Sequence, residues 1–351
     1  MEEKQNITLE VLAKRLGIST ATISRALNRH TQHKVKRQTR EKIQRLARKQ
    51  HYFPNISARN LVRGESHVIG IVIPYAPMIF CSEYYMQLLS GVSDGMMETR
   101  YSFTLHLATL TEKGKLIQFL RLKEIAGIIA AEWHFYCRSI KELESLRVPV
   151  LGINDPIPST KVCFVSCDNF QGARDGVQHL IEMGHRKIGM LLGPKNSLDN
   201  QERFKGYRTV LKENGIPLDP RWVIEAGRFE RPAGYQAMSQ LISEKIPVTA
   251  VFCANDEIAI GALKAITEKR LRCPQDISIL GFDGLKMGEY VHPPLTSVDQ
   301  KVYELAKQAV GALVDILEGR RRASFIEKVP CRLVERESVS HVREIALGVK
   351  S

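Results

Sequence analysis

Six short apolar runs within residues 68–283 constrain the fold of this chain more than any other feature. They are VIGIVIP at 68–74, IAGIIA at 125–130, VPVLGI at 148–153, KIGMLLG at 187–193, TAVFCA at 249–254 and ISILGFD at 277–283. Continuous apolar runs separated by amphipathic segments are typical of parallel strands that are buried on both faces of a sheet. The pattern predicts a doubly wound α/β body. It is long enough for two similar α/β halves with a ligand cleft at the carboxyl ends of their strands.

The positive charge of the chain is concentrated at its N-terminus. The whole chain of 351 residues has a formal net charge of +13. Residues 1–65 hold 15 Lys and Arg against 5 Asp and Glu, which is +10 and leaves only +3 for the rest. This asymmetry indicates that one small module contacts a nucleic acid or an anionic membrane, while a merely solvated basic face is the alternative.

The same basic segment has the pattern of three short helices. TLEVLAKRL at 8–16 places its leucines on one face, with Thr8 positioned to cap the first turn. Gly17 and Ile18 then form a turn, Ser19 caps a second helix, and residues 39–50 repeat an apolar helical pattern. Two helices joined by a tight turn that contains glycine predict a helix-turn-helix unit, whose second helix enters the DNA major groove.

The second helix has an unusual polar face. Its members recur at helical spacing and are short or hydrogen-bonding residues: Thr20, Ala21, Ser24, Arg25 and Asn28. A solvated helix face usually carries long Glu and Lys side chains, so this flatter face is suited to approach another large surface closely.

Several classes of protein are disfavoured by what the sequence lacks. No signal-peptide pattern follows Met1, and no stretch approaches the roughly 18 apolar residues of a membrane helix, so we expect a cytoplasmic protein. The seven scattered cysteines are expected to be buried free thiols. Nucleotide-binding, hydrolase and zinc-protease motifs are missing, and His179 and His185 have no metal-ligand spacing, so we expect neither an enzyme nor a metal or cofactor.

At this level of detail the chain resembles the LacI/GalR family of transcriptional repressors. The N-terminal segments TLEVLAKRLGISTATISRALN, VKRQTREKIQRLA and YFPNISARNL follow the order of the family's DNA-binding headpiece. Further on, VSCDNFQGARDGVQHLIEMGHRKIGMLLGP, RFKGY, CANDEIAIGAL, DISILGFDG and PPLTSVDQ resemble the signatures of its effector domain.

The resemblance implies a specific architecture and set of partners. Residues 1–54 would be the helix-turn-helix headpiece, residues 55–65 a hinge helix or linker, and residues 66–351 a periplasmic-binding-protein-like body of two α/β subdomains for effector binding and dimerisation. The protein would be a homodimer on a pseudo-palindromic operator in double-stranded DNA. A small molecule between the subdomains would control operator affinity, with a sugar as the first candidate and a nucleoside or purine as the second.

The resemblance also assigns DNA contacts. Thr20 and Ala21 occupy base-choosing positions, and Arg25 occupies the position of an arginine that faces the major groove, where arginine pairs with guanine O6 and N7. Leu61 would wedge into the minor groove, with Arg59 beside it. Short hydroxyls at four positions match residues that hold the phosphate backbone, although capping or helix packing explains each of them equally well: Thr8, Ser19, Thr22 and Ser24.

Effector contacts are implied at six positions. Arg203 and Asp283 match a clamp on polar groups, and Phe229 matches an aromatic side chain that stacks on the ligand. Asn255 faces the expected cleft. Asn154 stands where lactose-repressor-like members have an aspartate, and Tyr84 or Tyr85 falls in the usually aromatic loop after the first strand, with a packing role as the alternative for these contacts. Asp256 either caps the helix that follows it or touches ligand.

Some features depart from the family pattern or leave alternatives open. The loop RHTQHKV after Asn28 is longer than usual, and Ala21 is small for a residue that chooses bases. The C-terminus has no apolar heptads, so we expect a dimer rather than a tetramer. An exported sugar-binding protein is a rival that the basic headpiece opposes, and an activating or ligand-independent regulator stays open.

Overall fold

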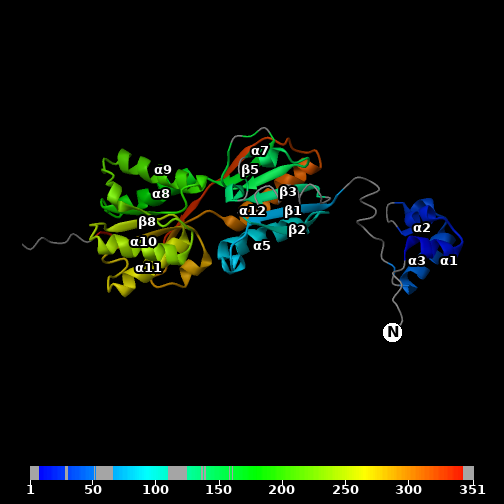
Figure 1. The fold of residues 1–351 in the computed structure, drawn as a ribbon, viewed down its shortest axis with the longest axis horizontal. Coiled ribbons are helices and arrows are strands. Elements are labelled where there is room, and N and C mark those ends of the chain that lie inside the picture. Colours follow the sequence, from blue (N-terminus) through cyan, green and yellow to red (C-terminus); the bar gives the residue numbers. More distant parts are fainter. Residues whose placement is uncertain are drawn as a thin grey trace, which may run out of the picture. The chain divides into compact units, whose positions relative to one another are not determined.

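The structure is a computed structural model that describes residues 8–27, 31–50, 52, 66–109, 125–135, 137, 140–157, 159 and 161–342. The chain forms two compact units, residues 1–66 and residues 67–351, which we call the headpiece and the body (Figure 1). Each unit is described by itself.

The described part of the headpiece is a small helical unit built as the apolar spacing predicts. Its helices are α1 (Leu9–Leu16), α2 (Thr20–Leu27), the 3-10 turn η1 (Gln32–Lys34) and α3 (Arg37–Lys49). Leu12, Ile23 and Ile43, one from each α-helix, are buried against one another in its core. The third helix starts at Arg37, two residues earlier than the sequence pattern indicated, because η1 and Lys36 lead directly into it.

The body contains two six-stranded sheets with the same strand order. The first sheet runs β11-β5-β4-β3-β1-β2 and the second runs β12-β10-β9-β8-β6-β7. In each sheet the first strand along the chain pairs in parallel with both the second and the third, so the strand order reverses there. This is the doubly wound arrangement that places ligand sites at the carboxyl ends of the strands.

The N-terminal subdomain surrounds the first sheet. Its elements are β1 (Val68–Pro74), η2 (Ile79–Cys81), α5 (Glu83–Met97), β2 (Ser102–Ala108), β3 (Gly127–Ala131), η4 (Trp133–Phe135), α7 (Ile140–Glu144), β4 (Val150–Ile153), β5 (Val162–Cys167), α12 (Val302–Leu317) and β11 (Ile326–Val329). Helices α5 and α12 pack closely, because a Cβ atom at Gly91 would lie only 2.2 Å from the carbonyl oxygen of Tyr303.

The C-terminal subdomain surrounds the second sheet. Its elements are α8 (Asn169–Glu182), β6 (Ile188–Leu192), α9 (Leu198–Glu213), η5 (Pro220–Trp222), β7 (Val223–Glu225), α10 (Arg231–Ser243), β8 (Ala250–Cys253), α11 (Asp256–Glu268), β9 (Ser278–Asp283), η6 (Lys286–Glu289), β10 (Thr296–Asp299) and β12 (Arg332–Val334). The chain crosses between the subdomains after β5, β10 and β11.

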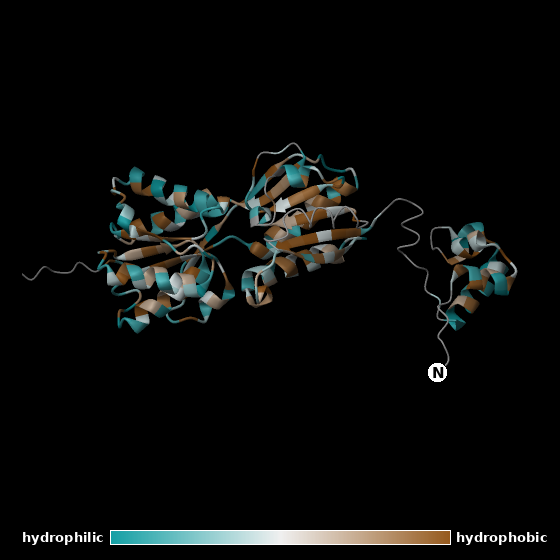
Figure 2. Ribbon diagram, viewed as in Figure 1, coloured by the Kyte–Doolittle hydropathy of each residue, from teal (hydrophilic) through white to brown (hydrophobic). Residues whose placement is uncertain are grey.

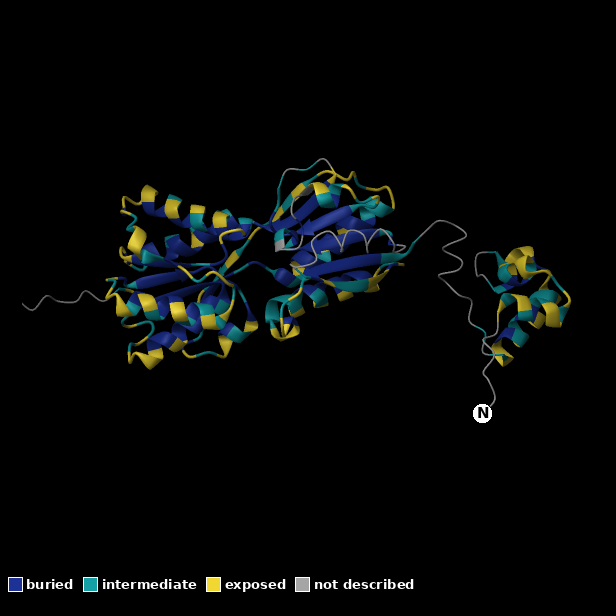
Figure 3. Cartoon of the chain, in the orientation of Figure 1, coloured by how far each residue is buried: buried dark blue, intermediate teal, exposed yellow. Residues whose placement is uncertain are grey.

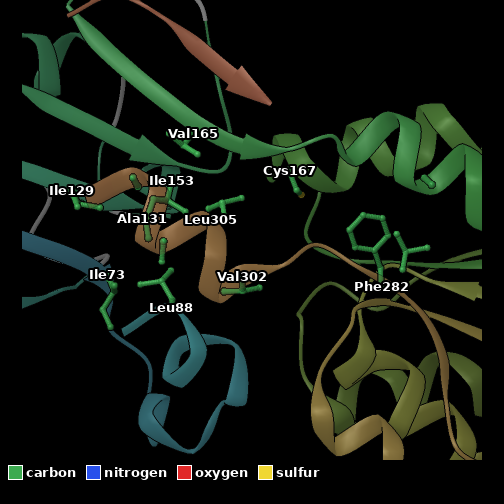
Figure 4. Close-up of a cluster of buried hydrophobic side chains, with 14 of the residues drawn as sticks. Ile73, Leu88, Ile129, Ala131, Ile153, Val165, Cys167, Phe282, Val302 and Leu305 are labelled. Atoms are coloured by element: carbon green, nitrogen blue, oxygen red, sulfur yellow. The ribbon is translucent and has the colours of Figure 1, made fainter. Parts of the chain in front are cut away.

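Burial follows the hydropathy pattern. The central strands of both sheets are apolar and buried, whereas the helices turn polar residues outward (Figures 2 and 3). One apolar cluster extends from the first sheet to the junction of the subdomains, where Figure 4 shows Cys167, Val302 and Phe282. Buried apolar side chains therefore lie at the junction of the two subdomains.

The six apolar runs all contain strands, which confirms the α/β prediction. The other strands were not predicted, because most are short or lie at sheet edges; β2, for example, is largely exposed or half-buried. The cysteine prediction was wrong in part: Cys137, Cys163, Cys167 and Cys253 are buried, but Cys81 is exposed, and Cys273 and Cys331 are partly exposed. Within the described ranges, no helix is both long and apolar enough to cross a membrane.

Candidate functional site

Helix α2 presents the polar face that its sequence predicted. Ile23 and Ala26 are buried in the headpiece core, whereas Thr20, Ala21 and Arg25 are exposed on the opposite side. Gln44 of α3 donates to the carbonyl of Ala26 at 3.4 Å, which ties the end of α2 to its neighbour. The exposed face is therefore held on a packed helix and is open to a partner.

Side-chain caps fix where the first two helices begin. The Thr8 hydroxyl accepts a hydrogen bond from Val11 N at 3.4 Å, and the Ser19 hydroxyl accepts one from Thr22 N at 3.2 Å. Gly17 lies between the two helices with φ of 63°, a conformation that glycine adopts at little cost. The expected helix-turn-helix geometry is present, and both caps use hydroxyls that also match phosphate-binding positions.

Three other expected DNA contacts, Asn28, Arg59 and Leu61, lie outside the described residues. Ser24 is half-buried on α2, and Thr22 is half-buried beside Ser19, with which it shares a hydroxyl hydrogen bond of 2.9 Å.

At the junction of the two subdomains, the structure brings together four of the expected effector residues. Tyr84 comes from α5 and Asn154 follows β4, both in the N-terminal subdomain, whereas Arg203 lies on α9 and Asp283 ends β9. Asn154, Arg203 and Asp283 are only 2–4% exposed. Residues from both sheets thus meet at the carboxyl ends of the strands, as a doubly wound fold predicts.

Gln300 connects the two sides of this junction. Its side-chain oxygen accepts from Asn154 Nδ2 at 3.4 Å, and its Nε2 donates to Asp283 Oδ1 at 2.6 Å. Asn154 Nδ2 also donates to the Tyr84 hydroxyl at 2.9 Å. A continuous chain of hydrogen bonds therefore runs from Tyr84 to Asp283 through two amide side chains.

Arg203 is held from several directions. It donates from Nε to Asn169 Oδ1 at 2.7 Å and from an η nitrogen to the carbonyl of Ala254 at 2.6 Å. The same η nitrogen is 3.6 Å from Asp283 Oδ1, and the guanidinium lies 3.9 Å from the ring centre of Phe282. This planar cation is thus oriented before any ligand arrives.

A second polar cluster links the subdomains beside the first. Asp155 N donates to Asp199 Oδ1 at 3.0 Å, and Asp199 N donates to Asp155 Oδ1 at 2.9 Å. His134 Nδ1 contacts the Asp155 carboxyl group, and the Tyr85 hydroxyl donates to Glu132. The two alternatives, Tyr84 and Tyr85, therefore have different partners. Tyr84 belongs to the hydrogen-bond chain through Asn154, whereas Tyr85 belongs to the cluster of acidic residues.

The carboxyls in these clusters have perturbed acidities. Burial, assisted by the charge of Asp155, raises the pKa of Glu132 to about 7. Burial also raises the pKa of Asp199, again with the help of Asp155. For Asp283, burial raises the pKa and the Arg203 guanidinium opposes the rise. Burial is thus the main cause of the raised pKa at each of these three carboxyls.

The remaining expected residues occupy different surroundings. Asn255 caps α11, since its Oδ1 accepts from Ile258 N at 2.9 Å. The capping alternative for Asp256 was therefore wrong; its carboxylate instead accepts from Leu285 N at 2.8 Å and from the Ser297 hydroxyl at 2.5 Å. Phe229 is half-buried against Gly193, where an added Cβ atom would lie 2.2 Å from the ring.

The sequence reasoning missed several members of the junction. They are Glu132, His134, Asp155, Asn169, Asp199 and Gln300. Glu132 directly follows β3, and Asp155 comes two residues after the end of β4. A search for polar residues at the ends of the predicted strands would therefore have found both. Gln300 ends PPLTSVDQ just after β10, but that strand was not predicted.

Comparisons with known proteins agree with this architecture. Residues 8–55 match the family described as bacterial regulatory proteins, lacI family, and residues 177–339 match a periplasmic binding protein-like domain. The transcriptional repressor CytR of Escherichia coli K12 is 31% identical over 336 residues, covering 94% of this chain and 96% of that protein. The repressor PurR of Haemophilus influenzae PittEE is 30% identical, covering 95% of this chain and 99% of PurR.

Solved structures extend the similarity to the fold of nearly the whole chain. A lac repressor dimer bound to operator and an anti-inducer aligns with a TM-score of 0.81 at 26% identity, covering 95% of this chain and 99% of that one. A complex of the regulator CelR with cellobiose aligns with a TM-score of 0.72 at 27% identity, covering 95% and 100%. With its helix-turn-helix headpiece and two-subdomain body, the chain belongs to the lacI family of bacterial transcriptional regulators.

Proposed function

We propose that this protein is a sequence-specific transcriptional repressor whose affinity for operator DNA is controlled by a small molecule bound between the subdomains of its body. The observation that carries the proposal is the exposed α2 face of Thr20, Ala21 and Arg25, mounted on a capped helix-turn-helix unit. That the related repressors CytR and PurR match almost end to end supports it.

The DNA contacts divide by chemistry. Arg25 reads guanine through paired donors, while Thr20 and Ala21 choose bases through a hydroxyl and a methyl contact. Backbone phosphates are held by Thr8, Ser19, Thr22 and Ser24. Asn28, which lies outside the described residues, is a further proposed DNA contact because it follows at helical spacing in the sequence. We propose residues 1–54 as the DNA-binding domain and residues 55–65 as a hinge whose Arg59 and Leu61 enter the minor groove.

The assembly we propose is a homodimer on a pseudo-palindromic operator. A two-fold protein reads two half-sites related by the same symmetry. The lac repressor structure, a dimer on its operator, supports this arrangement. Such a regulator acts on the chromosome, so we place it in the cytoplasm and assign it no catalytic activity.

A sugar or sugar derivative is the effector that we propose. The junction offers paired hydrogen-bonding groups in Arg203, Asp283 and Asn154, which suit several hydroxyls at once. Asn255 and Phe229 complete the proposed site from α11 and the loop before α10. Relatives solved with cellobiose and with ribose support a sugar.

The effector acts by a population shift in this proposal. It binds the two subdomain arrangements with different affinity, and each arrangement favours a different operator affinity. Any effector without that difference would leave operator binding unchanged.

Selection of bound duplexes from a random DNA library by the full-length protein tests the DNA-binding proposal. We expect a pseudo-palindrome, with operator affinity that falls steeply as salt rises, because each phosphate contact releases counterions. Arg25→Ala should relax base preference at one position in each half-site. The matched control Arg15→Ala changes an exposed arginine of α1, which donates to Gln50, and should leave base preference unchanged. Binding without sequence preference would contradict the proposal.

A further inference from the structure

One contact outside the expected effector residues joins the two subdomains directly. Glu83 is the first residue of α5 in the N-terminal subdomain, and its carboxylate reaches η6 of the C-terminal subdomain. Its Oε1 accepts from Lys286 N at 2.8 Å, and its Oε2 accepts from Met287 N at 2.9 Å. The two ends of this contact are more than 200 residues apart in the chain.

The backbone N–H groups of the η6 loop donate hydrogen bonds to acceptors in both subdomains. Gly284 N donates to the Ser297 hydroxyl at 3.2 Å, and Leu285 N donates to Asp256 Oδ2 at 2.8 Å. Both of these acceptors belong to the C-terminal subdomain, whereas the next two amides are taken by Glu83. Four consecutive N–H groups are therefore satisfied, two by each subdomain, and separating the subdomains must expose the second pair.

The Glu83 side chain is prepared for this contact. Gln87, one turn later on α5, donates from Nε2 to Glu83 Oε1 at 2.9 Å and so holds the carboxylate in place. A carboxylate that accepts two backbone N–H groups at the start of a helical turn forms charge-assisted hydrogen bonds, which are stronger than neutral ones.

The position of this contact connects it to the proposed effector site. Tyr84 directly follows Glu83 on α5, and Asp283 comes three residues before Lys286. Any movement of α5 relative to β9 that alters the Glu83 contact also alters the separation of Tyr84 and Asp283.

We propose that Glu83 is a positioning residue for the effector response: its carboxylate clasps the η6 backbone and holds the two subdomains in the arrangement seen in this structure. The role of Glu83 in an effector response rests on the proposed function. The contact between Glu83 and the η6 backbone does not depend on it. Removing it shifts the population toward arrangements in which the junction is open, before any ligand is added.

Hydrogen-exchange mass spectrometry of the full-length protein, without ligand, tests the clasp. Three variants are compared with the natural chain: Glu83→Ala, Glu83→Gln, and Glu289→Gln as the matched control. Glu289 lies on the same η6 turn, but its partner is Arg336 of its own subdomain, at 3.0 Å. Peptides that cover residues 284–289 report the clasp, and peptides that cover 153–157 and 197–201 report the reciprocal Asp155 and Asp199 contact.

The clasp predicts that Glu83→Ala raises exchange by about tenfold in both places, because loss of two charge-assisted hydrogen bonds favours opening. Glu83→Gln keeps one acceptor and should fall between the natural chain and the alanine variant. Glu289→Gln should leave residues 153–157 and 197–201 unchanged.

Three results would overturn the proposal. Faster exchange at 284–289 alone would make Glu83 a local cap of η6, and uniformly faster exchange across both sheets would make it a general stability residue. No change at any peptide would remove the clasp altogether. Failure of the DNA selection described above would leave this test untouched, so the two proposals can fail separately.

Discussion

Arg203 and Asp283, both of the C-terminal subdomain, face each other at the junction with 3.6 Å between an η nitrogen and a carboxylate oxygen, and both side chains are almost fully buried. Neither charge depends on the other alone, since Asn169 and Ala254 hold the guanidinium and Gln300 holds the carboxylate. A buried pair supported in this way is oriented for a polar ligand, but it is costly to break from one side.

Arg203→Ala should abolish the sugar response and leave operator binding intact. Because it strands Asp283 in a buried site, it should also lower the free energy of unfolding by about 3–5 kcal/mol. Arg203→Lys keeps the charge but not the planar fork, so it should lose the response at a smaller cost in stability. Operator binding titrated with cellobiose, ribose and related sugars measures the response, and urea unfolding measures stability. A full sugar response in the lysine variant would contradict the assignment.

Ser19→Ala and Ser24→Ala should separate capping from phosphate binding on α2. Loss of the Ser19 cap should destabilise the headpiece by about 1 kcal/mol and weaken operator binding as well. Ser24 makes no cap, so its alanine variant should weaken operator binding alone. Hydrogen exchange of α2 amides reports headpiece stability, and fluorescence anisotropy with an operator duplex reports affinity. If both variants speed exchange equally, the capping role of Ser19 is refuted.

Gly193→Ala should displace the ring of Phe229, because the new Cβ atom would lie 2.2 Å from it. If Phe229 stacks on the effector, the loss in binding free energy for the sugar should be at least as large as the loss in the free energy of unfolding. Gly311→Ala is the control: at this exposed position of helix α12 an added Cβ meets nothing within 4 Å, so it should stabilise the body by up to about 1 kcal/mol. Calorimetric titration with sugar and thermal unfolding give the two numbers. Undiminished affinity in the Gly193 variant would exclude Phe229 from the site.

Stability of the body should fall as pH rises between about 4.5 and 7 in part because of Glu132. Burial raises its pKa to about 7, so the folded protein keeps a proton that the unfolded chain releases nearer the ordinary value of 4.5. The folded state therefore binds more protons in this window, and raising the pH favours unfolding. Above pH 7 this contribution becomes constant.

Glu132→Gln should reduce that slope, because glutamine does not titrate and its oxygen can still accept from Tyr85. Urea unfolding at pH 5 and pH 8 measures the effect. Glu98→Gln, which changes an exposed carboxylate paired with Lys307, serves as the control and should keep the natural slope. The same slope in the Glu132 and Glu98 variants would show that Glu132 ionises normally.

Local chemistry explains why much of the fold could be predicted from the sequence. Apolar runs that are continuous over several residues can only be buried, so six of the strands and the α/β class followed from them. Thr8 and Ser19 marked helix starts because a short hydroxyl is the residue type that satisfies a free N–H group there. The exposed face of α2 followed from helical periodicity in the same way.

Only the tertiary structure decided which polar residues meet. Gln300 accepts a hydrogen bond from Asn154, more than 140 residues away in the chain, and Glu83 accepts from Lys286 and Met287, more than 200 residues away. No local pattern encodes these contacts. It also assigned the α11 cap to Asn255 rather than to Asp256. The carboxylate of Asp256 instead accepts hydrogen bonds from Leu285 and Ser297, which the packing of β9 and β10 places beside it. Periodicity and capping act between neighbours in the chain, whereas a site between two subdomains depends on how their sheets are placed, and that placement is set by the packed core as a whole.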